Sequence, residues 1–173
     1  TASADDAICF GGNIDISATG SGGTGNLTYT WMPGNLSGAT VNVAPTVTTT
    51  YIVTVEDELG CTSTDEVTII VNDNPVVSLN KTDATCEQDN GTIAVAVSGG
   101  TAAYTYSWSP NVSTTATASG LAVGTYAVTV TDANGCTGTA SITIENLASP
   151  TVTAAADQTI CEGSSATLSA SLN

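Results

Sequence analysis

Five cysteines are the residues of this chain whose type and spacing could do chemistry. The interval from Cys9 to Trp31 equals the interval from Cys86 to Trp108. The closest cysteines, Cys61 with Cys86 and Cys136 with Cys161, are 25 residues apart and the chain has no His, whereas a zinc site usually needs ligands about two to four residues apart. Regularly spaced cysteines in a chain rich in Ser, Thr and Gly are typical of disulfides in an oxidising, extracellular location.

Two schemes connect the cysteines. Pairing within each repeat joins Cys9 to Cys61 and Cys86 to Cys136, and closing each loop of about 50 residues would stabilise the fold by roughly 4 kcal/mol. This pairing depends on the topology of the repeat. If two strands lie between the Trp and the Tyr, the turns that hold the two cysteines fall at opposite ends of the sandwich, too far apart to bond. If only one strand lies there, or if the first strand is split, the two turns fall at the same end. Stacking of the repeats would instead join Cys9 to Cys136. We prefer the pairing within repeats and expect the partner of Cys161 to lie outside this chain.

Carboxylates are the second group with chemical potential. Sixteen Asp and Glu stand against one Lys or Arg, which gives a net charge of −15. With Lys81 as the only cation, no surface can neutralise phosphates, so nucleic acid and anionic membrane surfaces are not expected as partners. Direct membrane insertion is not expected either, because no run of apolar residues reaches membrane-spanning length. Calcium is the one cofactor to consider, since oxygen ligands suit it. Four candidate ligands stand at turns or at the linker, although Asp before Gly more often simply makes a turn: Asp73, Asp83, Asp89 and Asp132.

Catalysis is not predicted, and no catalytic residue is assigned. Because the chain lacks His and Arg, a Ser-His or Cys-His nucleophile cannot be built. A pair of carboxylates for glycoside hydrolysis needs a shared cleft, and nothing in the sequence brings two of them together.

The elements that hold these residues repeat along the chain. The stretch G-T-Y-A-V-T-V-T-D-A-N-G-C, residues 124–136, echoes T-T-Y-I-V-T-V-E-D-E-L-G-C, residues 49–61. In each copy a Tyr and two Val alternate with small or polar residues, which predicts a strand with one buried face. Further alternating runs predict strands on either side: 13–19, 26–32, 40–43, 66–72, 76–80, 92–98, 104–108, 117–121 and 139–145.

The repeat predicts separate domains. Asn72-Asp73-Asn74-Pro75 is polar and turn-prone, which indicates a linker. The interval from Pro75 to Pro150 is the same as the interval from Cys86 to Cys161. We therefore expect repeats at 1–74 and 75–149 and the start of a third at 150–173, with both chain ends inside a longer array.

The order of the marked residues indicates an all-β fold of tandem immunoglobulin-like, or PKD-like, β-sandwich domains. A Trp on the third strand and a Tyr near the start of the penultimate strand follow the immunoglobulin plan. The antibody core disulfide is absent, because Val53 and Val128 stand where it would place a Cys. The predicted core residues are Trp31, Tyr51, Trp108 and Tyr126.

Two segments carry a family resemblance. The run C-E-Q-D-N-G-T-I-A-V-A-V-S-G-G-T-A-A-Y-T-Y-S-W, together with G-L-A-V-G-T-Y-A-V-T-V-T-D-A-N-G-C ending at Cys136, resembles the SprB-type repeat of very large surface adhesins in gliding Bacteroidota. The first repeat, with I-C-F-G-G, W-M-P-G and T-T-T-Y-I-V-T-V-E-D-E-L-G-C, is similar to the PKD-like or Ig-like modules beside them, and I-C-E-G-S-S-A-T-L-S-A starts another.

The resemblance implies export by the type IX secretion system and a place on the bacterial cell surface. We expect a non-enzymatic stalk or filament segment of an extracellular adhesin, linked to adhesion or gliding. Its expected partners are neighbouring repeats, and surface glycans or proteins through other regions. Two alternatives stay open: a self-assembling filament subunit completed by strand donation, and a calcium-dependent glycan-binding module.

Overall fold

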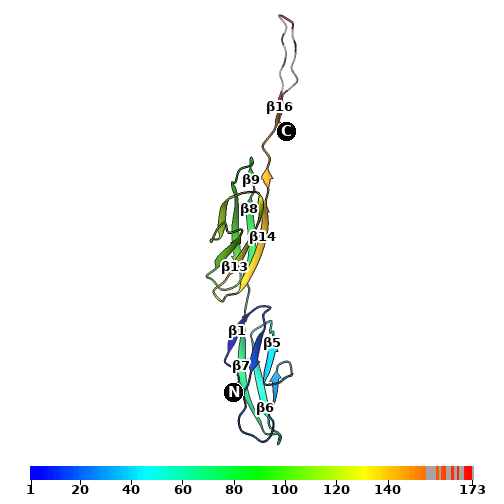
Figure 1. Ribbon diagram of the computed structural model, residues 1–173, viewed down its shortest axis with the longest axis vertical. Coiled ribbons are helices and arrows are strands. Elements are labelled where there is room, and N and C mark those ends of the chain that lie inside the picture. Colours follow the sequence, from blue (N-terminus) through cyan, green and yellow to red (C-terminus); the bar gives the residue numbers. More distant parts are fainter. Residues whose placement is uncertain (155–158, 160, 163–164, 166, 168–169, 173) are drawn as a thin grey trace.

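A computed structural model shows an all-β chain in which two sandwiches stand end to end (Figure 1). It describes residues 1–154, 159, 161–162, 165, 167 and 170–172. Most of the expected third repeat at 150–173 lies outside the described residues. We call residues 1–74 module 1 and residues 75–149 module 2. In the described part of the chain no helix could cross a membrane.

Module 1 contains two sheets. The larger has the strand order β1-β7-β6-β3-β4, and the smaller pairs β2 with β5. In chain order its strands are β1 (Asp6–Cys9), β2 (Ile14–Ser17), β3 (Thr28–Met32), β4 (Leu36–Ser37), β5 (Thr40–Val43), β6 (Thr49–Glu56) and β7 (Thr62–Asn72).

Module 2 repeats this plan with sheets in the orders β12-β10-β8 and β11-β13-β14, and a short pair β15-β9. Its strands are β8 (Val76–Thr82), β9 (Ala84–Thr85), β10 (Gly91–Ser98), β11 (Thr105–Ser109), β12 (Thr117–Leu121), β13 (Gly124–Thr131), β14 (Thr137–Ile144) and β15 (Asn146–Leu147). After it, β16 (Val152–Ala154) pairs with β17 (Ala170–Leu172).

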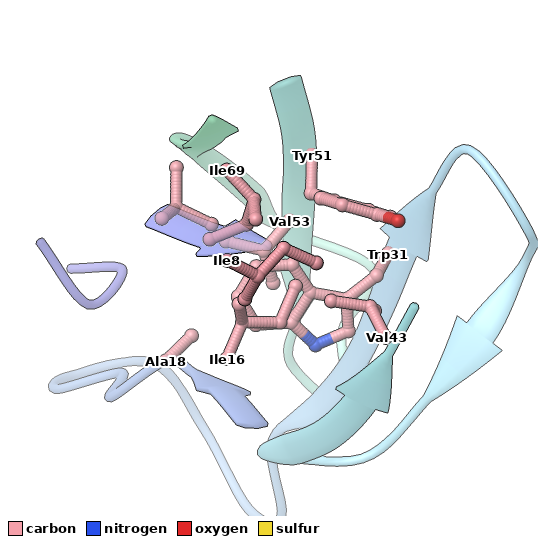
Figure 2. Packing of buried hydrophobic residues seen from close by; sticks show 9 residues of the cluster. Ile8, Ile16, Ala18, Trp31, Val43, Tyr51, Val53 and Ile69 are labelled. Carbon is pink, nitrogen blue, oxygen red and sulfur yellow. The ribbon is translucent and has the colours of Figure 1, made fainter. Parts of the chain in front are cut away.

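The alternating strands bury one face against a separate core in each module. In module 1 the indole of Trp31 is fully buried in the middle of the cluster, with Ile8, Ile16 and Val43 around it (Figure 2). Trp108 takes the same position in module 2. Each indole donates its Nε1 hydrogen to the carbonyl seven residues later, Gly38 for Trp31 and Thr115 for Trp108, both at 3.0 Å.

The two tyrosines of the plan lie in the same cores. Tyr51 is 7% exposed and Tyr126 is 6% exposed. The Tyr126 hydroxyl donates to the carbonyl of Ala122 at 3.0 Å, which ties β13 to the turn before it. The two clusters share no residue, so each module has its own core.

The first strand is split between the two sheets in both modules. In module 1, Ala2 bridges to Ala18, and the chain then crosses to pair β1 in parallel with β7. In module 2, β8 pairs with β10, after which β9 pairs in parallel with β15. The split delivers Cys9, the last residue of β1, to the end of the sheet where β7 finishes.

Candidate functional site at the junction of the modules

A disulfide crosses the junction. Cys9, at the end of β1 in module 1, is bonded to Cys136, just before β14 in module 2, with the two Cα atoms 5.5 Å apart. This separation lies inside the usual range for disulfides. Cys136 is 1% exposed, so the bridge is covered on the side of module 2. The modules are therefore joined twice, by the backbone at residues 73–75 and by sulfur.

The pairing preferred from the sequence, Cys9 with Cys61 and Cys86 with Cys136, is not the one that forms. Cys9 lies opposite Asn72 at the end of β7, whereas Cys61 directly precedes the start of that strand. Eleven residues at about 3.3 Å each place the two cysteines roughly 35 Å apart, far beyond the reach of a disulfide.

The same geometry separates Cys86 from Cys136. The amide of Cys86 donates to the carbonyl of Leu147, which lies beyond the far end of β14 from Cys136. A split first strand thus keeps the two cysteines of a module at opposite ends, contrary to expectation. The bond that forms is the one expected from stacking of the repeats, Cys9 with Cys136. Cys61, Cys86 and Cys161 are exposed free thiols.

An aspartate accepts the backbone hydrogen bonds of the turn before Cys136, and another does so in the turn before Cys61. The turn before Cys136 has the sequence Asp-x-x-Gly-Cys, and Asp132 is only 6% exposed. One carboxylate oxygen accepts the amide hydrogens of Asn134 at 2.9 Å and Cys136 at 2.8 Å. The other accepts the amide of Thr101 at 2.9 Å from the neighbouring loop.

Module 1 contains the same arrangement around Asp57. Its oxygens accept the amides of Leu59 and Thr24, both at 3.0 Å, and of Cys61 at 2.9 Å. In both turns the Asp amide donates to the Cys carbonyl, and the Gly amide donates to the Asp carbonyl. Gly60 and Gly135 have φ values of 80° and 81°, which glycine adopts without strain.

Hydrogen bonding to the charged form lowers the pKa of both carboxyls. For Asp57 the amide of Thr24 lowers the pKa most, followed by that of Cys61. For Asp132 the amide of Thr101 has the largest effect, and the amides of Cys136 and Asn134 add to it, while burial works in the opposite direction. Both side chains are thus ionised acceptors for backbone donors at neutral pH.

The linker packs closely on module 2. Pro75 is buried, and a Cβ added to Gly138 on β14 would overlap its carbonyl oxygen. A Cβ on Gly100 would lie 3.2 Å from the Pro75 nitrogen. On the other side of the junction, the Asn74 side chain donates to the Phe10 carbonyl at 3.1 Å. Two glycines therefore give the linker backbone its place beside the disulfide.

The four calcium candidates do not come together. Asp132 has three backbone donors, and Asp83 accepts from the amide of Glu145 at 2.8 Å and from the Lys81 ammonium at 2.7 Å. Asp73 lies in the linker and Asp89 in the loop before β10, both exposed. Across the described residues, no group of three or more His, Cys, Asp or Glu could hold a metal ion.

Sequence reasoning missed three parts of this junction: the contact of Pro75 with Gly138, its contact with Gly100, and the role of Asp57 and Asp132 in holding the cysteine turns. The repeated Asp-x-x-Gly-Cys pattern was the signal for the last of these, because it occurs at the same place in both modules. No pattern in the sequence indicated the glycine contacts, since they depend on how the linker folds back.

Comparison with known proteins places this geometry among tandem Ig domains. Residues 78–113 match the SprB repeat family. No curated protein matches the chain. The N-terminal eight Ig domains of Down syndrome cell adhesion molecule are similar with a TM-score of 0.58 and 12% identity, over 86% of this chain and 24% of that chain. At this identity the likeness concerns the fold.

Two further solved structures are similar at lower scores. A C-terminal 282-residue fragment of intimin, in complex with the intimin-binding domain of its translocated receptor, has a TM-score of 0.46 and 15% identity over 89% of this chain and 64% of that chain. A three-Ig titin fragment has a TM-score of 0.42 and 13% identity, over 86% and 64%. The fold of this chain is an all-β tandem of immunoglobulin-like modules, and residues 78–113 of its second module match the SprB repeat.

Proposed function

We propose that this chain is a structural segment of an extracellular cell-surface adhesin, in which sandwich modules act as spacers. The observation that carries this proposal is the Cys9–Cys136 bridge, because it fixes the direction of one module relative to the next. A single backbone linker would allow bending at residues 73–75. A second covalent connection turns the pair into a short rod, which suits a stalk that holds other regions away from a cell.

The SprB match and the disulfide support the outside of a bacterial cell as the site of action. Export by the type IX system, a role in adhesion or gliding, and the absence of enzymatic activity belong to the same proposal. The partners of this segment are neighbouring modules, while glycans or proteins are contacted by other regions. The acidic surface supports this arrangement, since like charges keep adjacent filaments apart.

Of the two alternatives, calcium-dependent glycan binding has no support from the site, because the candidate aspartates are dispersed and Asp83 and Asp132 are already hydrogen-bonded. The strand-donation alternative depends on the third repeat, which lies largely outside the described residues. The spacer function is therefore the one that the geometry favours.

Antibodies against residues 1–149 test the proposal on cells that produce this protein. We expect them to label intact cells, and we expect brief protease treatment of those cells to remove the label. Deleting residues 75–149 from the gene should bring the labelled epitopes closer to the cell by about one module, roughly 35 Å. Labelling only after the cells are opened would contradict an extracellular location, and an unchanged epitope height would contradict a spacer.

A further inference from the structure

We infer that Cys61 is one half of a second intermodule disulfide, whose other half is a Cys9-type cysteine on a preceding module joined to module 1 through an Asn-Pro linker. The inference rests on the serial order of modules in the proposed function. It concerns the partner of one end of module 1, the end that faces away from module 2 (Figure 1).

The turn that holds Cys61 is the counterpart of the turn whose cysteine is bonded. Asp57 and Asp132 each accept three amides from matching positions, and corresponding hydrogen bonds have nearly equal lengths in the two turns. The amide of Glu58 donates to the Thr24 carbonyl at 3.1 Å, as that of Ala133 does to the Thr101 carbonyl at 3.0 Å. Cys61 is thus presented like Cys136, but its thiol is free and exposed.

The surface beside Cys61 corresponds to the surface on which module 1 and its linker rest in module 2. Gly23 is the counterpart of Gly100: both have positive φ, 80° and 67°, and a Cβ on either would lie close to the aspartate, 3.2 Å and 3.0 Å from Oδ2. On module 2 this surface carries Pro75. On module 1 it opens as a cavity of about 570 Å³, lined among others by Gly20, Gly23, Asp57, Cys61 and Ser63.

One residue of this surface differs. Ser63 on β7 pairs with Val55 as Gly138 on β14 pairs with Val130, so Ser63 takes the place of the glycine that touches Pro75. Its side chain occupies space that the Pro75 carbonyl uses on module 2. The incoming linker therefore lies further from the sheet on module 1 than Pro75 does on module 2.

Cys86 is not included in this inference. The amide of Gln88 donates to the Thr85 carbonyl as the amide of Gly12 donates to the Cys9 carbonyl, so the structural counterpart of Cys9 is Thr85. Cys86 stands one residue further along, despite its equal spacing to the Trp. Of the two free cysteines at residues 1–149, only Cys61 thus matches a residue that is bonded in the other module.

The chemistry is the oxidation of two thiols. The sulfur of Cys61 and the sulfur of the partner cysteine form one S–S bond and release two protons and two electrons. The electron acceptor is the disulfide of a thiol oxidoreductase in the oxidising compartment through which the protein passes, and that disulfide is reduced to a dithiol.

A fusion of residues 1–77 in front of the full chain tests the inference. The added Pro75 then stands before Thr1 at the same spacing as Pro75 stands before Ser78. After oxidation in a glutathione buffer, free thiols are alkylated and unreduced peptides are mapped with a protease that cleaves at Asp and Glu, since the chain has one Lys and no Arg. The added copy carries Phe10→Tyr and Leu59→Val at two exposed side chains, so that its Cys9 and Cys61 peptides differ in mass from those of the full chain. We expect a peptide that links the added Cys9 to Cys61 of the following module.

In that fusion, alkylation of Cys61 in the full chain should fall at least about tenfold, because a bonded sulfur does not react. The Cys61 of the added module should stay reactive and serves as the matched control. Replacing the full chain's Cys61 by Ser should leave the added Cys9 open to alkylation.

Three outcomes would overturn the inference. The first is that Cys61 of the full chain stays reactive in the fusion while the full chain's Cys9–Cys136 bridge is intact, and the second is that neither bridge forms. The third is that the unmodified chain forms a dimer linked through Cys61 while Cys61 of the full chain stays unpaired in the fusion. Failure of the Cys61 bridge alone would leave the spacer function standing, because that function depends on Cys9 and Cys136.

Discussion

At the scale of single residues, the two buried aspartates are the most informative side chains. Each carboxylate accepts three backbone amide hydrogens, from the turn itself and from the loop beside it. In the structure the oxygens of Asp132, one of the calcium candidates, accept amide hydrogens of the turn and of the neighbouring loop. What the sequence could not show is that this turn sets the position of a cysteine.

Acid should unfold the modules through these carboxyls. Asp57 and Asp132 have pKa values lowered from the ordinary 3.8 in the folded protein, so the stability that they contribute is full above a pH of about 5 and is lost as the pH falls through their folded pKa. Thermal melts between pH 7 and pH 2 should show this loss.

The double variant Asp57→Asn with Asp132→Asn is the control for this effect. It should melt several degrees lower at neutral pH, because losing one buried hydrogen bond shifts the Tm of a domain this size by about 4–8 °C. Its Tm should depend less steeply on pH, with a residual slope from Asp65 and Asp83, whose pKa values are also lowered. An unchanged slope would show that the titrating groups lie elsewhere.

The two tryptophans provide a second test at this scale. Trp31→Phe should destabilise module 1 by about 2–4 kcal/mol, because it leaves a gap in the core and removes the donor to the Gly38 carbonyl. Denaturant unfolding followed by circular dichroism measures the loss. The fluorescence of the remaining Trp108 follows the unfolding of module 2, and the midpoint of that transition should not change. Val47→Ala, at a side chain 69% exposed, should change stability by less than about 0.5 kcal/mol.

At the scale of elements, alternation predicted the central strands well and the short edge strands badly. The run from Thr117 to Leu121 is a strand with those limits, and the strands around Tyr51 and Tyr126 lie where the pattern put them. By contrast β1 and β9 were missed, because each is short and pairs in parallel along an edge, so that only one residue per strand is buried. The position of Cys9 depends on β1, and without that strand the sequence left two pairing schemes open and favoured the wrong one.

The linker contact at β14 should be sensitive to a single methyl group. Gly138→Ala adds a Cβ that overlaps the Pro75 carbonyl, so we expect a cost of about 1–3 kcal/mol and a linker lifted from the sheet. Reduction of the Cys9–Cys136 bridge by dithiothreitol should then be several-fold faster than in the native chain, because the junction opens more often.

Gly124→Ala on the adjacent strand is the matched control for this substitution. A Cβ there meets only the Tyr126 ring at 3.8 and 3.9 Å, which is ordinary contact. Its rate of reduction should equal that of the native chain. Equal rates for both variants would show that Pro75 does not depend on a glycine at position 138.

At the scale of the whole molecule, the bridge connects residues 127 positions apart in the sequence. In the chain-entropy model such a closure stabilises the native state by about 5 kcal/mol. Because each module has a core of its own, we expect the structural consequence to be seen mainly at the junction, as restricted bending.

The free thiols of the chain can measure this restriction. Cys61 and Cys86 lie at the outer ends of the two modules and are exposed, so a donor and an acceptor dye on them report the length of the pair, about 70 Å for two modules of roughly 35 Å. In a Cys161→Ser background, single-molecule energy transfer should give one narrow distribution. Adding Cys9→Ser and Cys136→Ala removes the bridge without adding a third dye site.

The unbridged variant should keep two folded modules and show a broad distribution shifted to shorter distances, since bending at residues 73–75 can only bring the outer ends closer. Restoring both cysteines should restore the narrow peak, and reduction by dithiothreitol should abolish it again. An equally narrow peak without the bridge would mean that the packing of Pro75 on Gly138 and Gly100 alone holds the rod straight. The sulfur link would then stabilise the junction without setting its direction, and the stalk would owe its stiffness to the linker.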